Sequence, residues 1–358
     1  YFIPILFLFL ASCGDTDSGS EKDSEWTITD MLGRTVVFEE RPETAIGLRA
    51  GALRLLVYLD AVDMVAGIEE PEREAMRPYL YAWPELRHKR VAGPLMGGDT
   101  EMLVSIQPDV IFLTFTTAGQ ADDLQRRTGI PVVALEYGNF YDQMEVFFEA
   151  LHLMADVLGR EERAKNLEYE IRKQLHELEE RTADIPDNER KNVYVGGVSY
   201  RGARGIQSTE PFYPSLQFIH AINLASTLNE SLINPIQGTY VDVEQILLWD
   251  PDILFIDMAG WNAIRNELRS GTPLAETLTA RKKGEIYALH PYNNYAANYE
   301  TILANAWYAG SVLYPDRFSD IDIQEKSNQI YTLFLGQPVY NEMAEEFGPY
   351  ENISDLLD

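Results

Sequence analysis

Two stretches in distant parts of this chain follow the same pattern. Residues 101–114 read EMLVSIQPDVIFLT, and residues 244–257 read EQILLWDPDILFID. In both, a glutamate stands seven positions before a proline, a short apolar helix lies between them, and Pro-Asp leads into a strand. Proline ends the helix because it cannot donate the next backbone hydrogen bond. One such unit is common in α/β proteins, but two of them predict a pair of lobes built to one plan.

Short apolar segments alternate with helical patterns in both halves of the chain. The expected strands are 45–48, 65–68, 110–113 and 132–135 in the first half, and 193–195, 253–256 and 285–289 in the second. Strands that are apolar on both faces and separated by helices indicate parallel sheets covered on each side. The sequence therefore predicts the α/β class, with two Rossmann-like lobes of mostly parallel sheets. Other expected elements are a hairpin over 27–38 and helices over 52–59, 213–223 and 299–314.

A long charged helix is expected between the lobes. Apolar residues recur at helical spacing from Met144 to Leu158, stop at Gly159, and resume with oppositely charged pairs four positions apart. The predicted organisation is a signal peptide (1–12), a tether (13–25), an N-terminal lobe (26–158), a connecting helix (159–185), a C-terminal lobe (190–340) and an acidic tail (341–358). The sequence suggests no function for the tail.

The first residues are typical of a lipoprotein. The apolar run from Phe2 to Leu10 is too short to span a bilayer and has the length of a signal-peptide core. Ala11, Ser12 and Cys13 follow, and then a polar segment. This order resembles a bacterial lipoprotein signal, which implies that Cys13 is lipidated and that the signal peptide is truncated at its start. The alternative is an apolar arm with an ordinary free cysteine.

Charge and cysteine content exclude several classes of function. The chain has 57 acidic and 29 basic residues, a formal net charge of −28, so nucleic acid is a poor partner. Cys13 is the one cysteine, so the chain can form neither an internal disulfide nor a thiolate metal cluster.

These features together resemble a known family, the periplasmic binding proteins of ABC importers for iron–siderophore complexes, haem and cobalamin (class III). The resemblance runs from Trp26 to about Leu335 and rests on the opening WTITD…GRTV, the repeated Glu…Pro-Asp…strand units and the long helix. Residues 51–54 (GALR) and 292–295 (YNNY) resemble a branch described as metal or iron-complex receptors.

The resemblance implies a fold, a function and a location. Two lobes joined by one long helix would hold a ligand in the cleft between them. The protein would be a monomer without an intrinsic cofactor, anchored by lipid to the membrane in the periplasm or on the outer face of the cell. It would hand its ligand to a dimeric ABC permease.

Glu101 and Glu244 are the candidate docking residues. The family docks through one surface acid in each lobe, and these two glutamates occupy the matching positions. Equivalent acids on two similar lobes fit a symmetric partner. The alternative is that each glutamate only stabilises a helix N-terminus, where negative charge is favourable, and both roles can hold.

Loops after the expected strands supply the candidate ligand-binding residues. Arginine grips carboxylates and tyrosine offers a flat face with a polar tip, which favours an organic metal chelate or a tetrapyrrole with carboxylates. The candidates are Arg49, Arg54, Thr116, Tyr137, Tyr200, Arg201, Arg204, Trp261, Tyr292 and Tyr295. His290 is a candidate axial ligand or metal contact, with a loop histidine bonded to backbone as the alternative. The cargo is expected to be an iron complex (siderophore or haem), with a corrinoid or a free metal ion left open.

An enzyme and a surface sensor or adhesin are the competing classes. The segment 196–200 (GGVSY) lacks the Gly-x-Ser-x-Gly spacing of a nucleophile elbow. The chain has neither a HExxH metal motif nor a GxxxxGK[ST] phosphate loop. A chelate-processing enzyme stays open, although the lipoprotein start argues against it. The sequence therefore predicts a binding protein and not an enzyme.

Overall fold

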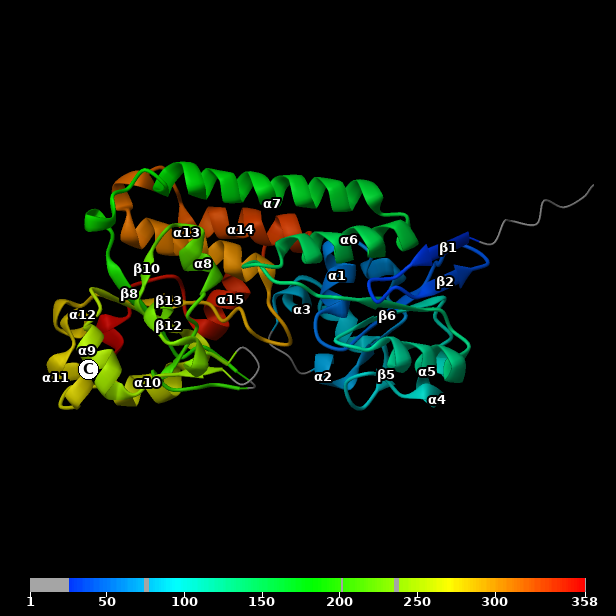
Figure 1. Cartoon of the computed structure of the whole chain (residues 1–358), viewed down its shortest axis with the longest axis horizontal. Coiled ribbons are helices and arrows are strands. Elements are labelled where there is room, and N and C mark those ends of the chain that lie inside the picture. Colours follow the sequence, from blue (N-terminus) through cyan, green and yellow to red (C-terminus); the bar gives the residue numbers. More distant parts are fainter. Residues whose placement is uncertain (1–25, 74–76, 201, 235–237, 358) are drawn as a thin grey trace, which may run out of the picture.

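Two α/β lobes lie side by side along a layer of long helices (Figure 1). The computed structural model describes residues 26–73, 77–200, 202–234 and 238–357. The expected signal peptide, the tether with Cys13, and the candidate Arg201 lie outside these ranges.

The elements alternate along the chain as an α/β protein requires. The strands are β1 (Trp26–Thr29), β2 (Thr35–Phe38), β3 (Ala45–Leu48), β4 (Gly67–Glu69), β5 (Arg90–Gly93), β6 (Val110–Thr114), β7 (Val132–Leu135), β8 (Asn192–Gly196), β9 (Ser208–Thr209), β10 (Ile222–Asn223), β11 (Thr239–Tyr240), β12 (Ile253–Asp257) and β13 (Ile286–Leu289). The helices are α1 (Ala52–Tyr58), α2 (Glu70–Arg73), α3 (Pro78–Ala82), α4 (Thr100–Ile106), α5 (Ala118–Thr128), α6 (Met144–Leu158), α7 (Glu161–Thr182), α8 (Pro214–Gln217), α9 (Val243–Trp249), α10 (Trp261–Glu267), α11 (Pro273–Thr277), α12 (Thr279–Lys283), α13 (Tyr299–Leu313), α14 (Ile323–Leu335) and α15 (Tyr340–Phe347).

Each lobe is built on its own parallel sheet. The N-terminal sheet has the order β3-β6-β7, and the parallel pair β4-β5 joins it through a bridge between Ala45 and Val65. The C-terminal sheet has the order β10-β8-β12-β13, with every pair parallel. All residues of β6 and β12 are buried, which is why these strands read as continuous apolar runs. The α/β class and the two mostly parallel lobes are confirmed, and the expected hairpin is the antiparallel pair β1-β2.

The helix expected over 213–223 is wrong. α8 covers only one turn, and the chain leaves it through His220, whose φ is 52°. A left-handed residue interrupts the helical hydrogen bonding, and the chain continues into the short strand β10.

The two repeated units have the same surroundings. Each short helix, α4 or α9, leads through Pro-Asp into the central region of its sheet. The amide of Asp109 donates to the carbonyl of Thr44 (3.1 Å), and its carboxylate accepts from the Thr44 amide (2.8 Å). Asp252 forms the same pair of bonds with Asn192 (2.9 and 3.0 Å). The aspartate of each unit therefore ties its strand to the start of the neighbouring one.

The lobes are joined by more than the expected helix. α7 runs along both lobes, with α13 and α14 beside it (Figure 1). α14 belongs to the C-terminal half but also packs against α1 and α3 of the N-terminal lobe. Arg163 of α7 donates to the carbonyl of Tyr58 at 2.8 Å. The connection is a helical layer, which is stiffer than a single helix.

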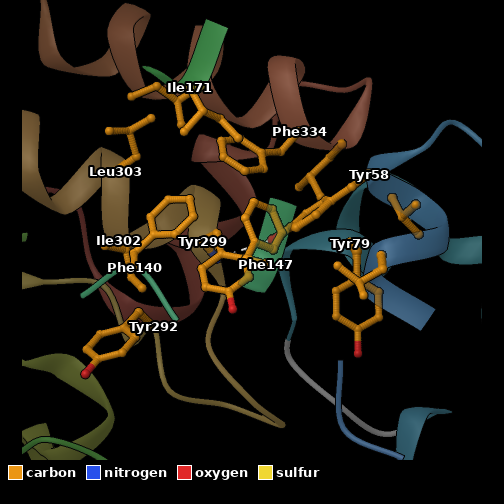
Figure 2. Packing of buried hydrophobic residues seen from close by; sticks show 14 of the residues in the cluster. Tyr58, Tyr79, Phe140, Phe147, Ile171, Tyr292, Tyr299, Ile302, Leu303 and Phe334 are labelled. Carbon is orange, nitrogen blue, oxygen red and sulfur yellow. Dashed lines mark hydrogen bonds between the residues drawn. The ribbon is translucent and has the colours of Figure 1, made fainter. Parts of the chain in front are cut away.

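A shared hydrophobic core lies under this layer. Figure 2 shows Tyr299, the first residue of α13, beside Phe140 and Phe147 of the N-terminal half. Its ring centroid lies 4.4 Å from that of Phe140 and 4.3 Å from that of Phe147. Two smaller clusters stay within one lobe each. Because moving the lobes far apart would expose the shared core to water, this packing opposes wide opening.

The segment expected to be an acidic tail is part of the C-terminal lobe. Met343, Tyr350 and Leu357 are buried. The amide of Ile353 donates to the carbonyl of Ile286 at 2.8 Å, and a short antiparallel bridge joins residues 287 and 352. The segment thus covers the free edge of β13, which would otherwise expose unpaired backbone groups. Within the described ranges, no helix combines the length and the apolar content needed for a bilayer crossing.

Candidate ligand-binding cleft

A cleft of about 1410 Å³ lies between the two lobes. Loops after β3, β5 and β6 form its N-terminal wall, and loops after β8, β12 and β13 form most of its C-terminal wall. These loops meet because the carboxyl ends of parallel strands lie at one edge of each sheet. The fold therefore places loops from both lobes around one space.

Aromatic and sulfur-containing side chains form much of the cleft surface. They are Met96, Phe115, Tyr200, Met258, Trp261, Tyr295 and Phe347. Phe115 is 60% exposed although it follows a buried strand, and its φ is 46°. A large apolar side chain held towards solvent in this way suits contact with the flat or apolar part of an organic ligand.

Arg49 contributes a positive charge to this surface. Its guanidinium donates to the carbonyl of Phe115 and to the side-chain oxygen of Gln120 (3.3 Å). Among the residues that the structure describes, no carboxylate lies within ion-pair distance of it. Its charge is therefore available to an anionic ligand, and the remaining donors of its fork can reach one.

The structure brings four of the sequence candidates together in the cleft lining, and they are Arg49, Tyr200, Trp261 and Tyr295. The hydroxyl of Tyr200 donates to Glu210, and that of Tyr295 donates to Glu69 at 2.7 Å. Both tyrosine hydroxyls are thus engaged within the protein, which orients the rings.

Arg54 and Tyr137 do not line the cleft. Every residue of α1 is buried, so Arg54 lies inside the protein, where it donates to the carbonyls of Asn294 and Tyr295 (3.1 Å each) and of Ala297 (2.9 Å). It also donates to the hydroxyl of Tyr137 at 2.5 Å. Its role is to hold a C-terminal loop against the N-terminal lobe, which is a correction of the sequence prediction.

The glycine of the GALR segment serves the same contact. Gly51 has φ of 87°, and a Cβ atom there would lie 2.2 Å from the ring of Tyr137. No larger residue fits between α1 and that ring.

His290 and Tyr292 are also buried and lie outside the lining. The His290 ring stacks on Tyr350 at 4.2 Å, and its Nε2 is 2.9 Å from the carbonyl oxygen of Gly348. Burial lowers the pKa of His290 to about 4, so the ring is neutral at ordinary pH. The metal role is therefore not supported, and the alternative of a histidine bonded to backbone holds. Within the described part of the chain, no three His, Cys, Asp or Glu side chains are grouped for a metal ion.

Thr116 and Arg204 lie beside the lining and not in it. The hydroxyl of Thr116 donates to Gln120 (3.2 Å), which also receives a bond from Arg49. Arg204 donates to the carbonyl of Tyr200 at 2.8 Å. Both support cleft residues without facing the space itself.

The sequence analysis missed the C-terminal part of the wall. Glu346, Phe347, Gly348 and Leu356 line the cleft, although they belong to the supposed tail. A signal for this was present, because Tyr340, Met343 and Phe347 recur at helical spacing and mark an amphipathic helix.

Residues 52–293 match the sequence profile of the family described as periplasmic binding protein. The chain belongs to the periplasmic binding protein family. Membership makes this periplasmic binding protein a substrate-binding component and not an enzyme, and it implies a location outside the cytoplasm.

Individual relatives share the whole architecture. The protein is 23% identical over 329 residues to the molybdate-binding protein MolA of Haemophilus influenzae, covering 86% of this chain and 90% of the relative. The structure of MolA bound to molybdate superposes with a TM-score of 0.67 at 21% identity, covering 87% of this chain and 98% of that one. A periplasmic solute-binding protein from Veillonella parvula gives 0.69 at 18% identity, with 92% and 98% covered. These likenesses confirm the two-lobe fold.

Glu101 and Glu244 are exposed in the first turns of α4 and α9. The two helices lie at opposite ends of this periplasmic binding protein, on the side away from α7 (Figure 1). In α4 the capping bonds are made by Asp99, whose carboxylate accepts from the amides of Glu101 and Met102 (3.0 Å each). The Glu101 carboxylate is therefore not needed for these capping bonds, although its charge is still favourable at the helix N-terminus.

Proposed function

We propose that this periplasmic binding protein is the lipid-anchored receptor of an ABC importer, and that it captures an anionic iron chelate, either a siderophore complex or haem. The observation that carries the proposal is the cleft itself, about 1410 Å³ in volume, which is lined by aromatic side chains and by Arg49, a cation that forms no ion pair with any described residue. A chelate of several hundred daltons fills such a space, presents rings to the aromatic wall, and offers carboxylate or catecholate oxygens to the arginine.

A tetrahedral oxyanion is the second candidate. It is favoured by Arg49 and by the likeness to a molybdate-binding relative. An oxyanion needs several converging donors and little apolar surface, whereas this cleft is wide and aromatic. A bare metal cation is disfavoured, because the described residues hold no grouped ligands for it.

Binding titrations distinguish these ligands. Trp261 lines the cleft, so its fluorescence should report a ligand that enters. A ferric tris-catecholate, haemin, cyanocobalamin and sodium molybdate are added separately to the purified protein. We expect a submicromolar Kd for the ferric chelate or for haemin. If molybdate alone saturates the protein, the oxyanion function replaces the proposal. If cobalamin alone saturates it, the corrinoid function replaces the proposal. Binding of none of the four ligands would refute both proposed cargo classes.

Replacing Arg49 with glutamine should weaken binding of the anionic chelate by about 30-fold, because the complex loses a charge-assisted hydrogen bond. Arg90→Gln is the matched control, since Arg90 is exposed on the same lobe and donates to Ser105. Isothermal titration of both variants measures the change. Equal affinities for wild type and Arg49→Gln would remove this arginine from the ligand site.

Reversing the charge of both docking candidates should abolish delivery but not capture. We expect Glu101→Lys with Glu244→Lys to lower uptake of labelled ligand at least about tenfold, because the charge of both surfaces proposed to contact the permease would be reversed. The ligand Kd should stay at the wild-type value. The control carries Glu162→Lys and Glu180→Lys on α7, the same change in net charge on the far side of the molecule. Unimpaired uptake by the first variant would eliminate the docking role.

The lipid anchor at Cys13 is part of this proposal. It rests on the apolar run and the small residues that precede that cysteine. The mass of the N-terminal peptide of the membrane-bound protein tests it, and an unmodified Cys13 would refute it.

A further inference from the structure

A buried carboxylate, that of Glu69, lies directly behind the cleft wall. Glu69 ends β4 and is 0% exposed. The pairing of β4 with β5 slips between Ile68 and Glu69, so that Glu69 lies opposite Gly93. An irregularity of this kind redirects a side chain from the position that a regular strand would give it.

Four hydrogen-bond donors converge on this carboxylate. Oε2 accepts from the amide of Arg49 (2.8 Å) and from the hydroxyl of Tyr295 (2.7 Å). Oε1 accepts from the amides of Gly97 and Gly98, the latter at 3.2 Å. No basic side chain in the described ranges forms an ion pair with Glu69. The four donors, and not a cation, therefore compensate its negative charge. Burial raises the pKa of Glu69, and the bonds from Tyr295, Gly97 and Arg49 act in the opposite direction.

All four donors belong to residues with left-handed backbone. The φ angles are 68° at Arg49, 57° at Tyr295, 99° at Gly97 and 75° at Gly98. This conformation is unfavourable for arginine and tyrosine and persists only where surrounding contacts hold it. The Glu69 carboxylate provides such contacts, because it accepts hydrogen bonds from Arg49 and Tyr295 themselves.

The bonds also connect the two lobes. Arg49 lies on the N-terminal wall of the cleft, and Tyr295 lies on the C-terminal wall. A Cβ atom at Gly97 would lie 3.4 Å from Nε of Arg49, so the 97–98 turn lies next to the arginine side chain. The same carboxylate thus bonds to the backbone of Arg49, to the 97–98 turn and to the Tyr295 hydroxyl from the other lobe.

We propose that Glu69 is a positioning residue for the ligand, which fixes Arg49 and Tyr295 from opposite lobes at the spacing that an anionic ligand requires. This inference rests on the proposed function, in which Arg49 contacts the cargo. Glu69 itself does not line the cleft, so it acts through the residues that it holds.

Glu69→Gln is the decisive variant. The side-chain amide keeps the size of the carboxyl group, but its nitrogen is a donor and cannot accept the bonds made to one of the two oxygens. Asp30→Asn is the matched control. Asp30 is also buried in the N-terminal lobe and accepts from the amides of Leu32, Arg34 and Ala134 (2.9 to 3.1 Å), but it lies outside the cleft lining. It also pairs with the Arg34 guanidinium at 2.8 Å, so this control disturbs a buried ion pair as well and is the more demanding one for the fold.

Affinity is measured with the ferric tris-catecholate, haemin and molybdate probes. We expect Glu69→Gln to weaken binding by about 30-fold and Asp30→Asn by less than about twofold, although both lose buried hydrogen bonds. In the Arg49→Gln background, Glu69→Gln should weaken binding by less than about fivefold, because its effect passes largely through the arginine. If wild type binds a probe and Glu69→Gln binds it equally well, the inference is overturned and the proposed function stands.

Hydrogen exchange provides a test that needs no ligand. The amide of Asn298 donates to the carbonyl of Tyr292 at 2.8 Å and lies in the C-terminal loop that contains Tyr295. We expect amides of residues 293–298 to exchange about tenfold faster in Glu69→Gln, with no change in Asp30→Asn. Unchanged exchange in this loop would overturn the inference. Absence of binding by wild type to any probe would instead reject the proposed function.

Discussion

Replacing Arg54 with methionine is expected to lower the free energy of unfolding by about 4 kcal/mol. The guanidinium is fully buried and bonds to three carbonyls of the 294–297 loop and to the hydroxyl of Tyr137. Methionine fills a similar volume but donates no hydrogen bond. The carbonyls of Asn294 and Ala297 keep bonds from Asn298 (3.3 Å) and from the Tyr137 hydroxyl (2.7 Å), but the loop loses all of its bonds to the guanidinium. The loop belongs to the C-terminal half and the helix of Arg54 to the N-terminal lobe, so the loss falls on a contact between them.

The effect of this change extends to Glu300. Burial raises the pKa of this carboxyl, and the charge of Arg54 acts in the opposite direction. Without the arginine, Glu300 should take up a proton on folding, which adds to the loss of stability near neutral pH.

Denaturant unfolding followed by circular dichroism measures the change caused by Arg54→Met. Arg126→Met is the control, because Arg126 is 70% exposed and, among the described residues, forms its ion pair with Asp123 on the same helix. It should change the free energy of unfolding by no more than about 0.5 kcal/mol. A loss below about 1.5 kcal/mol for Arg54→Met would show that the buried arginine is not an important interlobe contact.

Asp257→Asn is expected to remove a decline in stability that wild type shows as pH rises from about 4 to about 7. Asp257 ends β12 and is fully buried. Its Oδ1 accepts from the amide of Ala259 at 3.0 Å, and the backbone amides of Ala259 and Ser199 both favour the charged carboxylate. Burial raises the pKa of Asp257 to about 7 from an ordinary value of 3.8.

The sign of the effect follows from proton binding. Between these two pKa values the folded carboxyl keeps its proton while the unfolded one has lost it, so ionisation favours the unfolded state as pH rises. At about 1.4 kcal/mol per pH unit, the free energy of unfolding should fall by up to about 4 kcal/mol across this window. Asparagine has no proton to lose, so any change in hydrogen bonding at this position produces only an offset that is independent of pH.

Unfolding free energies at several pH values between 4 and 8 test this expectation. Other buried acids contribute to both curves, so the difference between wild type and Asp257→Asn isolates this carboxyl. Asp156→Asn, a change on the exposed face of α6, should keep the wild-type pH dependence. Parallel curves for wild type and Asp257→Asn would contradict the prediction.

The architecture could be predicted because its signals are local. Proline after a short apolar helix, as at positions 108 and 251, ends that helix in any context, and a run such as residues 110–114 reads as a buried strand. The repeat of such units predicted two lobes, and the fold agrees with it. The helix expected over 213–223 failed because its apolar spacing did not reveal the left-handed backbone at His220.

The site was predicted only in part, because the sequence does not show which polar side chains are buried. Two arginines illustrate this. Arg49 and Arg54 stand five positions apart, and both looked suited to grip an anion. Arg49 faces the cleft, whereas Arg54 lies on a helix that is covered on all sides by distant segments. Nothing in the neighbouring residues distinguishes them, because the carbonyls that Arg54 satisfies lie about 240 positions later in the chain.

Periodicity and backbone chemistry therefore determined the two lobes, the long helix and the loops that end at the cleft. The tertiary structure decided which polar side chains face the cleft, made the supposed tail a cleft wall, and brought four donors from loops to Glu69. Secondary structure reflects residues that are neighbours in sequence. Burial and hydrogen-bond partnership depend on segments that meet only when the two halves pack together.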